Sequence, residues 1–137
     1  MPSSRDDALH EAAIAAAKQA YAPYSGLSVG AALRSASGNL HRGCNVENGA
    51  LPIGGCAERA AIASAVLAEG AGFRLSAIAV AAFARDGTPL PVAPCGACRQ
   101  ALIEFGPEAR VEFLGPGGWV ATTAHELLPH RFVLPDT

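Results

Sequence analysis

Two short segments of the chain combine cysteine with charged residues in a pattern that suits metal chemistry. The segment GGCAERAAI (54–62) places Cys56 two residues before Glu58, and PCGACRQ (94–100) contains Cys95 and Cys98. Each segment is predicted to begin a helix, where the helix dipole and free amide groups favour thiolate over thiol. Three thiolates from two helix starts can therefore converge on one zinc ion.

A zinc ion held by three protein ligands keeps one tetrahedral position open, which is typical of catalytic zinc, whereas structural zinc is closed by a fourth residue. Cys44 is a poor candidate for that fourth ligand, because it falls in a predicted strand and is expected to be a small buried residue. The histidines show no ligand spacing relative to the cysteines, so we expect them at the surface or in local hydrogen bonds. They are His10, His41, His125 and His130.

Glu58 is the candidate group for proton transfer. On a regular helix it points about 200° away from Cys56, so it is not a simple further ligand, but in the first turn it can lean over the open position. Zinc lowers the pKa of water from about 15.7 to about 7, and a carboxylate there can act as general base and then as general acid. The alternative role is an acid that merely complements the helix dipole.

Arg59 lies three residues after Cys56, on the same predicted helix face. Three thiolates on one zinc carry net negative charge, and an arginine that donates hydrogen bonds to the sulfurs would withdraw part of it. We therefore expect Arg59 to contact the sulfurs. Arg99 competes for this role, and either arginine could instead form a surface ion pair.

The composition excludes several classes of function. The 137 residues carry a formal net charge of -2, with a pI near 6.0, and no basic cluster, so we expect no nucleic-acid partner. Segment 1–21 is neither a signal peptide nor a membrane span, so we expect a cytoplasmic protein without a membrane partner, and cysteines kept reduced. Because 50% of residues are hydrophobic and only 16% are charged, partner chains are expected to cover apolar surface.

The pattern of elements predicts one α/β domain over residues 1–137, with a mixed sheet and helices on both of its faces. The first helix is expected to be capped by Ser3 or Ser4 and to end at segment 22–26. The remaining expectations are strands at 27–35 and 41–47, a helix at 56–69, a buried strand at 75–83, a loop at 85–94, a helix at 95–105, strands at 109–115 and 119–124, and a short helix at 124–130.

Five segments in order resemble the small zinc-dependent cytidine deaminases that assemble as homotetramers. They are APYSGLSVGAAL, GCNVEN, CAERAAI, PCGACRQ and ELLP, and the resemblance runs from about Tyr21 to Phe132. The C-A-E and P-C-x-x-C pattern is that of the nucleobase deaminases. The resemblance implies a three-layer α/β/α fold with a central mixed five-stranded sheet, and a homotetramer whose subunits share their sites.

The resemblance also implies roles for individual residues. It makes Cys56, Cys95 and Cys98 the ligands of one Zn²⁺ per subunit, and Glu58 the proton shuttle in hydrolysis of cytidine or deoxycytidine to the uridine product and ammonia. The other implied roles are substrate contacts: Asn45 and Glu47 to the ribose hydroxyls, Leu27 and Ala57 to the nucleoside in the pocket, and Phe132 to the base in a neighbouring subunit's site.

Some residues depart from the family pattern. Leu27 replaces a common phenylalanine, Leu51 a usual tyrosine, and Gly49 a typical alanine. These changes leave the zinc chemistry intact. They do not determine whether the site prefers ribose or deoxyribose, or whether it accepts modified bases. The alternatives are therefore a deaminase of a modified cytosine nucleoside such as blasticidin S, and, in another class, a zinc-binding interaction module without activity. Asn45 and Glu47 argue against the first, and Glu58 against the second.

Overall fold

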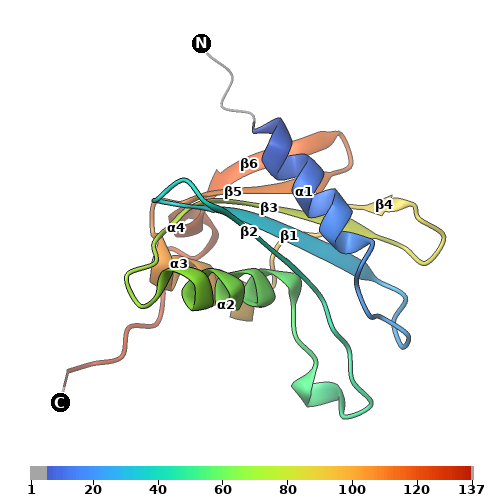
Figure 1. Ribbon diagram of the computed structural model, residues 1–137, viewed down its shortest axis with the longest axis horizontal. Helices are drawn as coiled ribbons and strands as arrows, with labels where there is room; N and C mark the ends of the chain where they lie inside the picture. The colour runs from blue at the N-terminus through green and yellow to red at the C-terminus, as the bar shows by residue number, and fades with distance from the viewer. Residues whose placement is uncertain (1–5, 137) are drawn as a thin grey trace.

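The computed structural model describes residues 6–136 and shows a mixed β-sheet with helices on both faces (Figure 1). The sheet order is β2-β1-β3-β5-β6; β3 and β5 are parallel and the other pairs are antiparallel. The predicted five-stranded mixed sheet is confirmed. A further two-residue strand, β4, pairs with the end of β3 inside the segment that was expected to be a loop. The strands are β1 (Ser28–Ser35), β2 (Leu40–Cys44), β3 (Leu75–Phe83), β4 (Pro89–Leu90), β5 (Arg110–Gly115) and β6 (Gly118–Thr123).

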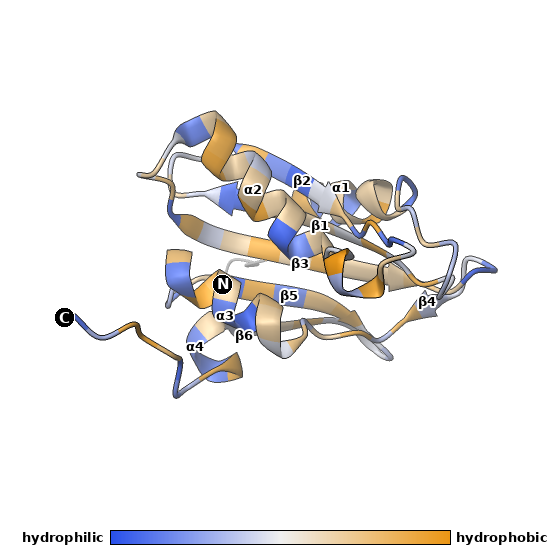
Figure 2. Ribbon diagram, turned by 90° about the horizontal axis from the view of Figure 1, so that it is seen from below, coloured by the Kyte–Doolittle hydropathy of each residue, from blue (hydrophilic) through white to orange (hydrophobic). Residues whose placement is uncertain are grey.

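The helices divide between the two faces of the sheet. Helix α1 packs on one face, while α2 and α3 pack on the other (Figures 1 and 2). Over residues 6–136, no helix is long and apolar enough to cross a membrane. The helices are α1 (Asp7–Ala17), α2 (Ala57–Glu69), α3 (Gly96–Phe105) and α4 (Ala124–Leu127), with a 3-10 helix, η1 (Leu51–Ile53).

The apolar run of β3 lies at the centre of the sheet, as predicted. Residues 77–82 are buried, because β1 and β5 flank this strand and helices cover both of its faces. Figure 2 shows the apolar colour along β3, which is seen there between α2 and α3. The core is therefore split into two clusters, one on each side of this strand.

The boundaries of all four α-helices differ from the predictions. Helix α1 is capped by Asp6, whose carboxylate accepts from the Leu9 amide at 3.0 Å, whereas Ser3 and Ser4 lie outside the described residues. Helices α2 and α3 each begin one residue later than expected, because Cys56 and Cys95 are their N-caps with extended backbone. Helix α4 ends at Leu127, short of the predicted residue 130.

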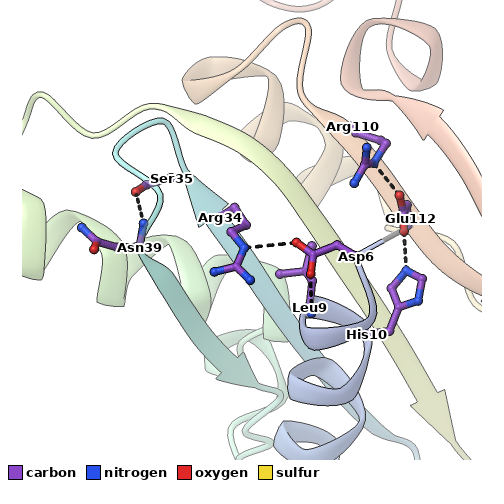
Figure 3. Close-up of polar contacts among 8 residues, drawn as sticks. All are labelled: Asp6, Leu9, His10, Arg34, Ser35, Asn39, Arg110 and Glu112. Atoms are coloured by element: carbon purple, nitrogen blue, oxygen red, sulfur yellow. Dashed lines mark hydrogen bonds and ion pairs between the residues drawn. The ribbon is translucent and has the colours of Figure 1, made fainter. Parts of the chain in front are cut away.

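A buried polar cluster joins α1 to strand β5 of the sheet (Figure 3). His10 of α1 is 4% exposed and its Nε2 contacts the Glu112 carboxylate of β5, which also pairs with Arg110. The His10 ring stacks on Trp119 of β6, with centroids 3.8 Å apart and planes 9° apart. His10 is thus a buried hydrogen-bonding residue and not a surface one, a difference that arises because its partners come from strands more than 100 residues away.

Glu112→Leu should destabilise the fold by about 1–3 kcal/mol, because it removes the buried acceptor that His10 and the partly exposed Arg110 share. Urea unfolding of the zinc-loaded protein measures this change. Glu104→Leu is the matched control, since Glu104 is exposed on α3 and such surface changes usually stay within about 0.5 kcal/mol. Equal effects of the two substitutions would contradict a stabilising role for the cluster.

Candidate active site

The three cysteines of the two segments meet where helices α2 and α3 begin. Cys56 and Cys95 are the N-cap residues of these helices, and Cys98 follows in the first turn of α3. An N-cap side chain normally accepts a hydrogen bond from the first helical turn, but neither cysteine makes such a bond. Neither sulfur is therefore used as the side-chain cap of its own helix.

The sulfur positions fit a metal ion. The Sγ atoms of Cys56, Cys95 and Cys98 all lie within 4.8 Å of one another. A tetrahedral zinc ion with bonds of about 2.3 Å holds its sulfurs about 3.8 Å apart, so one ion can contact all three. Burial and the nearby charges of Glu58 and Cys56 raise the pKa of the Cys98 thiol, so a thiolate there requires a compensating cation.

The cluster has only three members among residues 6–136, because no histidine, carboxylate or fourth cysteine joins it. Cys44 lies outside it and is half-buried, which is more exposed than predicted. All four cysteines are free, as expected of a chain whose thiols serve a metal instead of disulfides. Three protein ligands leave the fourth tetrahedral position available to another molecule.

Glu58 is buried next to this cluster. Its side chain is in the second position of α2 and the residue is 4% exposed. Because Cys56 is an extended N-cap and not a helical residue, the 200° separation expected on a regular helix does not apply, and both side chains line one cavity. Burial raises the pKa of the Glu58 carboxyl, while hydrogen bonds from its own backbone amide and from Cys98 act against that rise.

Arg59, and not Arg99, contacts the sulfurs. Arg59 Nη2 donates to Cys56 Sγ at 3.4 Å. Arg99 instead donates to backbone carbonyls, from Nε to Pro94 at 2.7 Å and from Nη1 to Leu127 at 3.2 Å. The donors of Arg99 therefore hold the start of α3 and the end of α4 in place, and the hydrogen bond to a cysteine sulfur comes from Arg59.

A cavity of about 310 Å³ opens beside the cysteine cluster. Sequence reasoning missed part of its wall, because Val80, Val92 and Ala93 carry no chemistry that marks them as pocket residues. Leu51, which departs from the family pattern, also lines this cavity. The expected site residues that line the cavity are Leu27, Asn45, Glu47, Cys56, Ala57, Glu58 and Cys95.

Asn45 fastens the strand end at which it lies. Its Oδ1 accepts from the Val29 amide at 2.7 Å and its Nδ2 donates to the Leu27 carbonyl at 2.8 Å. An amide oxygen has two lone pairs and an amide nitrogen two protons. The side chain therefore keeps one acceptor and one donor site for a ligand in the cavity.

Glu47 is held by the turn at residues 22–26. Its Oε1 accepts from the backbone amides of Tyr24 and Ser25 at 2.9 and 3.1 Å, and its Oε2 accepts from the Ser25 hydroxyl at 2.5 Å. The Ser25 hydrogen bonds lower the pKa of the Glu47 carboxyl. Mutual hydrogen bonds between Val46 and Gly55 close the intervening loop, which brings Glu47 to the same cavity as Cys56.

Phe132 does not line this cavity. Phe132 is 65% exposed. Its backbone pairs with the Gln100 side chain: Gln100 Nε2 donates to the Phe132 carbonyl at 2.9 Å, and the Phe132 amide donates to Gln100 Oε1 at 3.1 Å. The structure therefore separates Phe132 from the other expected site residues of the same chain.

Gly43→Ala should displace the start of α2 and with it the metal site. A Cβ at Gly43 would lie 2.3 Å from the Ala61 nitrogen and 2.5 Å from the Ala57 oxygen, both backbone atoms of α2. Overpacking of this kind costs about 1–3 kcal/mol, and we expect lower zinc content as well, measured by metal analysis after dialysis. Gly72→Ala is the control, because a Cβ there meets nothing within 4 Å; equal zinc content in both variants would refute this account of α2.

Comparisons with known proteins agree with one another. Residues 3–114 match the model for the cytidine and deoxycytidylate deaminase zinc-binding region. The cytidine deaminase of Sporosarcina psychrophila is 42% identical over 88% of this chain and 86% of its own length. The cytidine deaminase of Halalkalibacterium halodurans is also 42% identical, over 90% of this chain and 91% of its own length. The crystal structure of cytidine deaminase from Burkholderia pseudomallei superposes with a TM-score of 0.81 at 44% identity, covering 93% of this chain and 99% of that one.

The fold and the three-cysteine cluster define a zinc-binding α/β protein. The comparisons specify which kind: the chain belongs to the cytidine and deoxycytidylate deaminase family. In this family the zinc ion is the resident cofactor, and Cys56, Cys95 and Cys98 bind it.

Proposed function

We propose that the protein hydrolyses cytidine and deoxycytidine to uridine and deoxyuridine, with release of ammonia. The observation that carries this proposal is the meeting of a buried carboxylate, Glu58, with a three-cysteine cluster at a cavity that also contains Asn45 and Glu47. The relatives that the chain resembles are cytidine deaminases, two of them over about nine-tenths of its length.

Zinc, when bound, supplies a Lewis acid that lowers the pKa of water toward neutrality. Glu58 takes up a proton from water and gives it to N3 of the cytosine ring. It then takes the proton of the hydroxyl added at C4 and gives it to the amine, which leaves as ammonia while the C4 carbonyl forms. Its burial removes competing solvent from these transfers. Arg59, through its contact with Cys56 Sγ, withdraws negative charge from the sulfur.

The sugar is the part of the substrate that Asn45 and Glu47 recognise. Asn45 offers one donor and one acceptor, and Glu47 offers acceptor sites on a carboxylate that the turn at 22–26 orients. A diol can satisfy both side chains. Leu27 and Ala57 line the same cavity, and we assign the base to this apolar part of its wall.

We further propose that the enzyme is a cytoplasmic homotetramer in which Phe132 reaches the site of a neighbouring subunit. Large apolar side chains are exposed around the cavity and on the tail, with Leu51 at 70%, Ile53 at 69% and Phe132 at 65%. Surface of this kind is commonly covered by partner chains. Sedimentation of the zinc-loaded protein tests the assembly, and a monomer at micromolar concentration would contradict it.

The absorbance change of zinc-loaded protein with cytidine, deoxycytidine and blasticidin S, measured in parallel, tests the substrate assignment. We expect rapid loss of the cytosine nucleoside band with the first two compounds. Turnover of blasticidin S alone would replace this assignment with the antibiotic deaminase alternative. A zinc-containing protein that turns over none of the three would overturn the proposed activity.

A further inference from the structure

Arg85 occupies the turn between β3 and β4, outside the cavity, and its place is set by strand register. Antiparallel pairing places Ser28 opposite Phe83 and Val29 opposite Ala82. Extending this register by two residues places Gly26 opposite Arg85. The backbone therefore brings Arg85 to the turn at residues 22–26, which precedes β1.

The Arg85 guanidinium packs directly on the backbone of Gly26. A Cβ at Gly26 would lie 2.7 Å from Arg85 Nη2 and 2.8 Å from its Cζ and Nε, so the guanidinium fills the space that a side chain at residue 26 would need. Gly26 also has a φ of 75°, a conformation that favours glycine. Although Arg85 itself is exposed, Gly26 is buried beneath it.

The covered turn is the one that holds Glu47. It is closed by a hydrogen bond from the Gly26 amide to the Ala22 carbonyl at 3.0 Å. Within it, the Tyr24 and Ser25 amides and the Ser25 hydroxyl bind both oxygens of the Glu47 carboxylate. The Ser25 hydroxyl oxygen also accepts from the Leu27 amide at 3.0 Å, which joins the turn to the cavity wall. Any motion of the turn is therefore transmitted to the carboxylate.

We infer that Arg85 is a positioning residue for sugar recognition: it fastens the turn at residues 22–26 and thereby fixes the Glu47 carboxylate for a ribose hydroxyl. This inference rests on the proposed function. Arg85 is not among the residues that line the cavity, so it acts through the turn and not by touching the substrate. Its positive charge also attracts the Glu47 carboxylate, in addition to the hydrogen bonds from Ser25 and Tyr24.

The test compares two substrates in Arg85→Met, with Arg42→Met as control because Arg42 is exposed on β2, away from the turn. For cytidine we expect KM to rise about five-fold with kcat nearly unchanged, the size expected when one hydrogen bond is weakened. For 2′,3′-dideoxycytidine, which lacks both hydroxyls, KM should not change. Arg85→Lys should restore part of the loss, because it keeps the charge but not the planar contact.

Two further measurements separate positioning from a general structural effect. In a Glu47→Gln background, Arg85→Met should have almost no additional effect on KM, because the two residues act in series. In a Glu58→Gln background, calorimetry should show the same five-fold loss in the binding of cytidine without turnover. Equal losses for both substrates, no loss for either, or full additivity with Glu47→Gln would overturn the inference. A wild-type protein that turns over neither nucleoside would overturn the proposed function itself, and the inference with it.

Discussion

Glu58→Gln should lower kcat for cytidine by about 10²–10⁴-fold, the usual contribution of a general acid–base group. Glutamine preserves the volume of this buried side chain, which is 4% exposed, so packing is maintained. The substitution removes the carboxylate that we propose accepts the proton from water and delivers it to the base. KM should change little, because the contacts proposed for the sugar come from other residues.

Steady-state absorbance measurements give kcat, and metal analysis of the same samples gives zinc content. Zinc should remain at the wild-type level, because Glu58 is not a member of the three-sulfur cluster. Glu104→Gln is a suitable control, since it makes the same chemical change on the exposed face of α3. Retained turnover in Glu58→Gln would assign proton transfer to another group, whereas loss of zinc would show that the carboxylate has a structural role.

The same experiment distinguishes an enzyme from a zinc-binding interaction module. Both would contain stoichiometric zinc, so metal analysis alone does not separate them. Only an enzyme loses turnover when a buried carboxylate is replaced by its amide. The burial of Glu58 at the cavity favours the enzyme, because an unneeded carboxylate at such a position costs desolvation energy.

Local sequence predicts the elements of this fold well where a periodic or apolar pattern is long. The run at 75–83 has the length and composition of a buried strand, and the sheet places it at the centre. The two-residue β4 carries no such pattern and forms only because the chain after Phe83 turns back along β3. Local sequence does not predict the burial of His10 either, since its partners Glu112 and Trp119 come from the other end of the chain.

At the site, the spacing of residues in the sequence predicts which side chains take part but not where those side chains point. A regular helix through Cys56 would have separated its side chain from Glu58, and only the extended backbone of the N-cap brings both to one cavity. Choosing between Arg59 and Arg99 required the contacts of each guanidinium. The support of Glu47 by Ser25 and Tyr24 spans more than 20 residues and depends on the bridges that join Val46 to Tyr21 and Gly55.

Cys98→Ala should abolish zinc binding and activity together. Cys98 is fully buried in the first turn of α3, where its sulfur completes the cluster with Cys56 and Cys95. Two remaining thiolates hold zinc far more weakly than three, so dialysis against a mild chelator should strip the variant and leave the wild type loaded. Because zinc stabilises only the folded chain, the variant should also lose the rise in melting temperature that zinc gives the wild type.

Cys44→Ala is the matched control for this change. Cys44 is a free, half-buried cysteine at the end of β2 and lies outside the metal cluster. The control should keep stoichiometric zinc, wild-type kcat and the stabilisation by zinc, since it removes a thiol without removing a ligand. Full zinc content in Cys98→Ala would mean that another residue supplies the third ligand. The three-cysteine site on which the proposed chemistry depends would then be wrong.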